Sequence, residues 1–141
     1  MKPIKKNNQR VAQDWIVHAQ SDLRYAKRGL DDRFILGAHV CFHAQQAAEK
    51  AVKALLLAHG WDFPFTHDIE TLIHLLKHHH IPIPACVLRA GSLTPYAAEL
   101  RYPGDMDEDI DQDEVLKAVR LAEQVVHWIK KAIEQAKKKT I

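Results

Sequence analysis

The sequence has few of the residues that interrupt or cross-link regular structure. Its 141 residues include only five glycines, six prolines and two cysteines. So few turn-forming residues favour long helices over many short strands. The cysteines, Cys41 and Cys86, lie in apolar surroundings and lack the C-x-x-C spacing of a redox or metal motif. We therefore expect reduced thiols in the core of a cytoplasmic protein.

Long apolar runs and a strong excess of one charge are also missing. No run approaches the roughly 18 apolar residues of a membrane span, and no apolar segment follows the basic stretch at 1–6. Neither a membrane span nor a signal peptide is therefore expected. The formal net charge is only +2, which is too small to argue for general nucleic-acid binding. The hydrophobic fraction of 47% and the charged fraction of 27% are typical of a globular domain.

Apolar residues recur at helical spacing along most of the chain and predict four helices. These helices cover about 9–29, 33–59, 66–80 and 112–137. Thr66 and Asp111 are the expected N-caps of the last two helices, and Gly60 is the expected stop of the second. The stretch 85–102 also has apolar helical content, but a glycine and a proline interrupt it. We therefore expect a short or broken helix there.

The connections between these helices are short, which makes neighbouring helices antiparallel. We therefore predict an all-α fold, namely an up-and-down four-helix bundle with an additional short or broken helix. The predicted organisation is one helical domain at 9–137. A basic N-terminal arm at 1–8 precedes it, and a basic C-terminal tail at 138–141 follows it.

The stretch 39–57 has an unusual distribution of polar residues for a helix. At about 100° per residue, five of its polar side chains fall within roughly 80° of one another. This polar stripe consists of His39, His43, Gln46, Lys50 and Lys53. Gln45 and Glu49 lie off one edge of the stripe, and apolar residues occupy most of the remaining circumference. We predict a helix covered on several sides, with the polar stripe either a solvent-exposed strip or part of a functional site.

Metal and nucleophile chemistry find little support in the sequence. The histidine pairs at 39 and 43 and at 74 and 78 each share a helix face, but neither belongs to an H-E-x-x-H motif. The acidic run at 105–114 starts with calcium-loop spacing, yet Ile110 and Leu116 occupy the positions of the required Gly and Glu. No G-x-S-x-G, P-loop or G-x-G-x-x-G motif occurs. We therefore expect neither a metal nor a cofactor.

A second cluster, at 96–103, combines an arginine with two tyrosines. Arg101 stands just before a proline turn, so its guanidinium can reach a phosphate or a carboxylate from a helix end. Tyr96 and Tyr102 can stack on a base or cap the core. The competing interpretation is that Arg101 pairs with the nearby acidic run while both tyrosines pack against the protein.

These stretches together resemble the HEPN domain (higher eukaryotes and prokaryotes nucleotide-binding). The resemblance rests on 42–56, with its Gln-Gln-Ala-Ala-Glu-Lys core, on Thr-His-Asp-Ile at 66–69 and on 96–103. It covers about residues 12–135 and implies an all-α bundle that is usually a homodimer. Stand-alone members of this family are often encoded beside a minimal nucleotidyltransferase. Such pairs include toxin–antitoxin systems in which the HEPN protein is an RNase.

The RNase members of that family carry an arginine, four to six further residues and then a histidine. Arg101 matches the arginine, but the residues that follow it, 102–108, include no histidine. Cleavage of RNA through a 2′-hydroxyl needs a base and an acid within hydrogen-bond reach. Because the expected histidine is missing, the sequence leaves RNA cleavage open.

We therefore expect a HEPN protein that binds a nucleotide or RNA phosphate and partners a nucleotidyltransferase in a toxin–antitoxin-like pair. Arg101 would hold the phosphate. The expected site residues are His43, Lys50, Lys53, His67, Tyr96, Arg101 and Tyr102. One alternative is a metal-independent RNase that uses Arg101 with a recruited histidine, such as His43 or His67. Another is a non-catalytic structural subunit with no ligand of its own.

Overall fold

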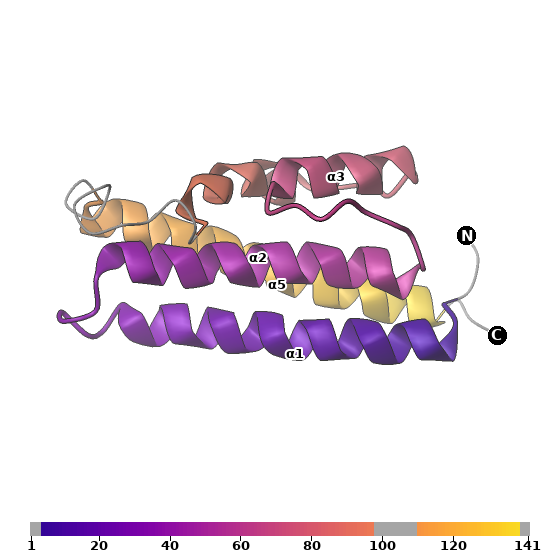
Figure 1. The fold of residues 1–141 in the computed structure, drawn as a ribbon, viewed down its shortest axis with the longest axis horizontal. Helices are drawn as coiled ribbons and strands as arrows, with labels where there is room; N and C mark the ends of the chain where they lie inside the picture. Colours follow the sequence, from indigo (N-terminus) through magenta and orange to yellow (C-terminus); the bar gives the residue numbers. More distant parts are fainter. Residues whose placement is uncertain (1–3, 98–109, 139–141) are drawn as a thin grey trace.

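The computed structural model describes residues 4–97 and 110–138, and every regular element in these two ranges is helical (Figure 1). The elements are α1 (Lys6–Gly29), α2 (Gly37–Ala58), α3 (Ile69–His78), α4 (Ala85–Leu88), the 3-10 helix η1 (Arg89–Tyr96) and α5 (Gln112–Lys138). The predicted all-α bundle is confirmed, and α4 with η1 is the predicted broken helix. None of the described helices is long and apolar enough to cross a membrane.

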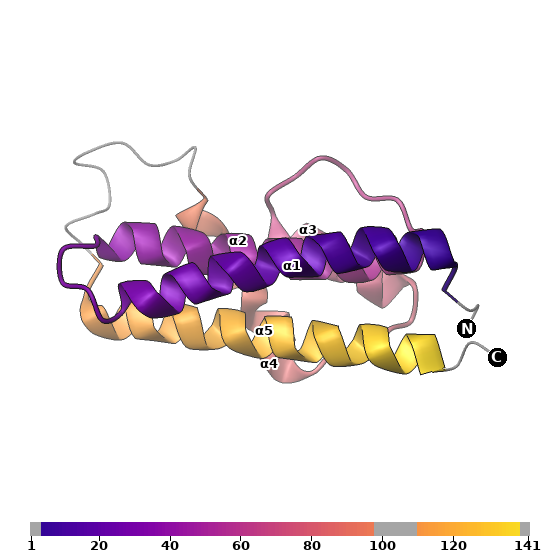
Figure 2. The ribbon, with the colours of Figure 1, turned by 90° about the horizontal axis from the view of Figure 1, so that it is seen from below.

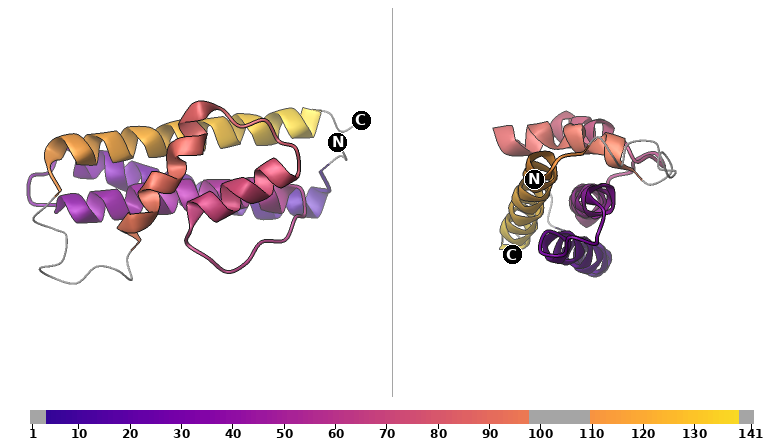
Figure 3. Two further views of the ribbon diagram at one scale, coloured as in Figure 1. Left: turned by 90° about the horizontal axis from the view of Figure 1, so that it is seen from above. Right: turned by 90° about the vertical axis from the view of Figure 1, so that its left-hand side faces the viewer.

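The long helices α1, α2 and α5 lie side by side along the long axis of the molecule (Figures 1 and 2). Seen end-on, these three helices stand at three corners, and α3, α4 and η1 lie across α2 and α5 (Figure 3). The connector 59–68 turns back along α2 before α3 begins (Figure 1). Since α2 packs against α1, α5, α3 and η1, the prediction of a centrally placed helix is confirmed.

The composition of α2 explains its central position. Alanines supply much of its buried surface, and such small side chains let neighbouring helices approach closely. Larger side chains then fill the space around it, and burying each one contributes about 1.5–3 kcal/mol. Those that are almost fully buried include Leu55, Leu56, Leu72, Leu76 and Ile129. Cys41 is buried and Cys86 half-buried, and neither cysteine forms a disulfide, in line with the prediction of reduced thiols.

Several helix ends differ from the predicted positions. Helix α1 begins at Lys6, three residues earlier than the periodicity suggested, because the buried Ile4 anchors the chain in the core just before it. Helix α2 begins at Gly37, since the backbone N–H of Phe34 donates to the Asp32 carboxylate and forms a turn instead of helix. At the other end of α2, Gly60 has a φ of +71°, which fits its predicted role as the stop.

The N-terminus of α3 corrects one prediction and that of α5 confirms another. Asp68, and not Thr66, is the N-cap of α3, with its Oδ1 accepting from the backbone N–H of Glu70 at 3.1 Å. The Thr66 hydroxyl instead accepts from the Asp68 N–H at 3.0 Å, so it shapes the turn that precedes the cap. At α5, Asp111 Oδ1 accepts from the Glu114 N–H at 2.8 Å, as its spacing predicted.

Candidate functional site

Polar side chains on and beside the stripe of α2 form two hydrogen-bonded networks. The first is the Asp22 network, in which one carboxylate of α1 holds two side chains of α2. Asp22 Oδ1 lies 2.9 Å from His43 Nδ1, and Asp22 Oδ2 accepts from Lys50 Nζ at 2.6 Å. The Tyr25 ring stacks on the His43 imidazole with centroids 4.7 Å apart. Because the His43 and Lys50 side chains keep 29% and 25% of their surface exposed, this network can meet a ligand from solvent.

The second is the Glu49 network, whose central carboxylate is buried. Glu49 Oε1 accepts from Gln45 Nε2 at 2.8 Å, and Glu49 Oε2 accepts from Lys53 Nζ at 2.9 Å. His67 of the connector brings its Nδ1 to 3.0 Å from Glu49 Oε1. The side chain of Glu49 is only 4% exposed, so these partners replace the water that its carboxylate gives up on folding.

Lys53 is the residue whose position differs most from the predicted stripe. It is 5% exposed and lies in the interior, although its helical angle placed it in the polar stripe. Three aromatic rings surround its ammonium, with centroids at 5.8 to 6.0 Å, and they belong to Trp15, Phe63 and Phe65. The connector therefore covers this end of the stripe, and Lys53 supports the wall of the site from within.

A shallow pocket of about 250 Å³ lies beside the Asp22 network. Its lining residues are Asp14, Trp15 and His18 of α1 and Lys50 of α2. We call it the α1–α2 pocket. It brings an indole, an imidazole, a carboxylate and an ammonium around one hollow. The indole and the imidazole can stack on a flat ring, and the Lys50 ammonium can donate to an anion.

The remaining predicted site residues lie apart from the stripe or outside the described ranges. Tyr96, at the end of η1, is half-buried, and its hydroxyl donates to Glu114 Oε2 at 2.5 Å. This contact ties η1 to the first turn of α5, in keeping with a packing role for Tyr96. Arg101 and Tyr102 fall within 98–109, outside the described residues.

Three polar residues of these networks were missed as site residues by sequence reasoning. Asp22 was not singled out, and Gln45 and Glu49 were placed off the edge of the stripe. One signal could have identified Glu49. A Glu and a Lys four residues apart, inside an alanine-rich helix that must be buried, are expected to pair.

Comparison with known proteins identifies the family. The model of the HEPN domain matches residues 12–133 of the chain. The chain belongs to the HEPN family. The matched HEPN region includes all of α2, α3, α4 and η1 and most of α1 and α5. Both networks and the α1–α2 pocket therefore lie inside the HEPN domain.

Two solved structures are similar to this HEPN chain over most of its length. TT1696 from Thermus thermophilus is 32% identical with a TM-score of 0.74, and the match covers 85% of this chain and 96% of that one. ST0689, an archaeal HEPN homologue, is 29% identical with a TM-score of 0.69, and the match covers 86% of this chain and 97% of that one. No match was found among curated proteins.

The HEPN site is rich in histidine–carboxylate contacts. In the ranges that the structure describes, no three His, Cys, Asp or Glu side chains gather as a metal site requires. The imidazoles of His43 and His67 each meet a carboxylate through Nδ1, which fixes the orientation of the ring. The arrangement thus offers oriented donors and aromatic faces on the side of the domain formed by α1, α2 and the connector.

Proposed function

We propose that this HEPN protein binds a nucleotide or an RNA phosphate, with the α1–α2 pocket as its contact site. One observation carries the proposal: Trp15, His18 and Lys50 line a single hollow on a face that also holds His43. An aromatic ring can stack on a base, which contributes about 1–3 kcal/mol per base. A lysine ammonium donates to phosphate oxygens as a point charge.

The Asp22 network prepares Lys50 for this role. Asp22 is only 14% exposed on its side chain, and its Oδ2 fixes the position of the Lys50 ammonium. A phosphate that approaches Lys50 would therefore meet an ammonium already held in place. The Asp14 carboxylate would repel that phosphate, so the phosphate belongs at the Lys50 side of the hollow. Asp14 is suited to accept from a ribose hydroxyl or a base amino group.

The other predicted residues take different parts in the proposal. Arg101 remains a proposed phosphate contact, with Tyr102 beside it, as the resemblance implies. Lys53 and His67 act through the Glu49 network and hold the connector against α2. Tyr96 has a structural role in this proposal, because its hydroxyl donates to Glu114.

Calorimetric titration with AMP and with a short single-stranded RNA tests this function. The Lys50→Gln variant loses one charge-assisted hydrogen bond to the ligand, so its affinity should fall about tenfold. Lys130→Gln removes the same charge from an exposed position on α5 and should leave the affinity within about twofold of wild type. Equal affinities for wild type and Lys50→Gln would remove the α1–α2 pocket from the proposal. Equal affinities for wild type and Arg101→Ala would remove Arg101.

RNA cleavage is a second candidate function, which the histidine–carboxylate contacts favour. A carboxylate that binds Nδ1 orients an imidazole for proton transfer through its other nitrogen. His43 has this contact with Asp22 and keeps 29% of its side chain exposed. In this alternative, His43 would replace the histidine missing after Arg101. If the purified protein at high concentration leaves single-stranded RNA intact, the alternative is wrong.

We also propose a homodimer that associates with a minimal nucleotidyltransferase in a toxin–antitoxin-like pair. Membership of the HEPN family and the motif stretches at 42–56 and 66–69 support this part of the proposal. The neighbouring reading frame is the first place to look for the partner, and co-purification tests the complex. If the complex forms but this protein has no affinity for nucleotides, the result would instead favour the alternative that it is a non-catalytic structural subunit.

A further inference from the structure

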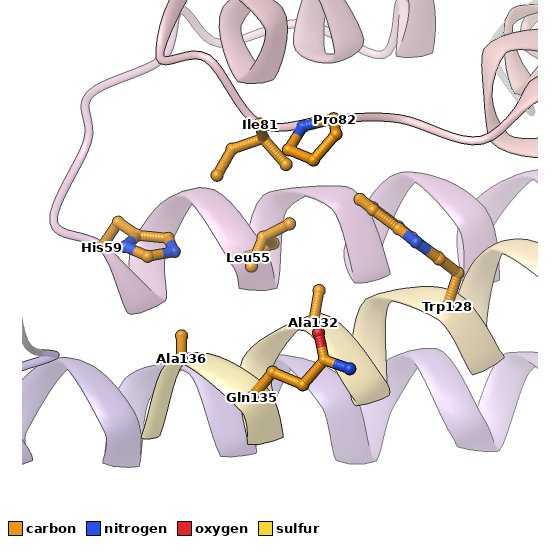
Figure 4. Close-up of a pocket in the computed structure, with 8 residues that line it drawn as sticks. All are labelled: Leu55, His59, Ile81, Pro82, Trp128, Ala132, Gln135 and Ala136. Atoms are coloured by element: carbon orange, nitrogen blue, oxygen red, sulfur yellow. The ribbon is translucent and has the colours of Figure 1, made fainter. Parts of the chain in front are cut away.

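A second pocket lies between the C-terminal halves of α2 and α5, beneath the connector that follows α3 (Figure 4). We call it the α2–α5 pocket, and its volume is about 190 Å³. Its lining residues are Leu55, His59, Ile81, Pro82, Trp128, Ala132, Gln135 and Ala136. It shares no lining residue with the α1–α2 pocket.

We propose that the α2–α5 pocket binds a small, neutral, planar nitrogen heterocycle of one or two rings. The volume sets the size, because drug-sized ligands need about 300 Å³ or more. The apolar walls of the pocket set the shape of the ligand, and its two polar side chains set the charge of the ligand.

The apolar walls favour a flat molecule. The Trp128 indole extends from α5 toward Pro82, so a ring that enters meets an aromatic surface and a prolyl surface (Figure 4). On the α5 side the space stays open because Ala132 and Ala136 carry only methyl groups. Leu55 of α2 supplies a further apolar wall of the pocket. Flat aromatic rings gain most from stacking in such a slot.

Two polar side chains line the pocket: His59 directly follows α2, and Gln135 belongs to α5. His59 is fixed before any ligand arrives, because its ring stacks on Trp61 at 4.3 Å and Trp61 stacks on His79 at 3.8 Å. Gln135 carries both a donor and an acceptor on its amide. A heterocycle with one N–H and one ring nitrogen matches this pair of groups.

The charge of the ligand follows from the state of His59. Burial, and to a smaller extent the nearby His79, lower the pKa of the His59 imidazole below its usual value. At neutral pH the imidazole is therefore uncharged, with one nitrogen that donates and one that accepts. A neutral ligand gains hydrogen bonds from such a group, whereas an anion would find no cation among the lining residues.

Titration with benzimidazole, followed by the indole N–H resonances of the ¹⁵N-labelled protein, tests the proposal. The three tryptophans separate the sites, since Trp128 lines the α2–α5 pocket and Trp15 lines the α1–α2 pocket. At about pH 7.5 and up to about 10 mM benzimidazole, the Trp128 resonance should shift and saturate, as expected for a small ligand with a millimolar Kd. Ala132→Leu fills the pocket and should abolish the shift.

A second variant keeps the test independent of any effect of Ala132→Leu on folding. His59→Phe retains a ring to stack on Trp61 but loses the hydrogen bond, so the affinity should fall about tenfold. The proposal is overturned if the Trp128 resonance fails to saturate, or if wild type and both variants respond alike. A shift of the Trp15 resonance alone would place the ligand in the α1–α2 pocket and would also overturn it.

Discussion

Buried polar side chains in α2 have to be satisfied by one another. Gln45, Glu49 and Lys53 are 0%, 3% and 5% exposed on a helix whose other inner residues are apolar. Burying an ion pair costs several kcal/mol per charge unless hydrogen bonds replace the lost water. Because His67 joins the same carboxylate, the network also ties the connector to α2 and so fixes which way this helix faces.

Glu49→Gln should destabilise the protein strongly. The substitution leaves the Lys53 ammonium buried without a carboxylate, and breaking a buried pair costs about 3–5 kcal/mol. Urea denaturation measures the change in the free energy of unfolding. Glu134→Gln is the matched control, because it removes the partner of Lys137 in an exposed pair and should cost at most about 1 kcal/mol. Similar losses in the two variants would contradict the structural role of Glu49.

At the scale of the helices, close packing of α1 on α2 places the residues of the Asp22 network together. Gly29, at the end of α1, lies against Val40, and a Cβ built at Gly29 would stand 2.7 Å from Val40 Cγ2. That distance is too short for two carbon atoms, so the glycine is required by the contact between the helices. The same close approach keeps Asp22 of α1 within hydrogen-bond distance of α2.

Gly29→Ala should therefore lower the melting temperature. Alanine gains up to about 1 kcal/mol of helix propensity, whereas overpacking typically costs about 1–3 kcal/mol. Thermal unfolding of Gly29→Ala, of Val40→Ala and of the double variant measures the coupling between the two positions. The double variant should lose less than the sum of the single losses, because removing the valine methyl groups makes room. A rise in melting temperature for Gly29→Ala alone would show that the helices readily move apart.

At the scale of the whole molecule, a stack of rings joins the ends of two helices. His59 follows the C-terminus of α2, His79 follows that of α3, and Trp61 lies between them. One ring of this stack, His59, also lines the α2–α5 pocket. Its stability depends on the protonation of His59, whose pKa burial and His79 lower below the usual value of 6.5.

The pH dependence of global stability follows from that lowered pKa. As the pH falls below 6.5, His59 takes up a proton in the unfolded chain but stays neutral in the folded one. The unfolded state then binds more protons, so the free energy of unfolding decreases with falling pH through the folded pKa. Above pH 6.5 the contribution of His59 to the free energy of unfolding is fully present. Urea denaturation at several pH values should therefore show a shallower decrease for His59→Gln than for wild type.

An exposed histidine provides the control for this pH series. His127→Gln removes a histidine from the outer surface of α5 and should keep the wild-type slope. If His59→Gln and His127→Gln both retain that slope, the stack does not couple protonation to folding.

Local signals in the sequence were sufficient to predict the helices and the centrally placed α2. Gly60 and Asp111 were recognised as a stop and a cap because both signals act within one turn of the chain. The dense apolar surface of 39–57 likewise required cover on several sides. Thr66 shows the limit of such signals, since a nearby aspartate caps α3 in its place.

Periodicity within single helices was enough to predict the fold class, the helix order and the stretch that carries the polar stripe. Which side chains meet, in contrast, depends on how the helices pack against one another. Asp22 lies 21 residues from His43 and 28 from Lys50, and His67 lies 18 from Glu49. Helical periodicity relates residues on one helix and says nothing about which face another helix offers. Packing therefore buried Lys53, left Lys50 partly exposed and created both pockets.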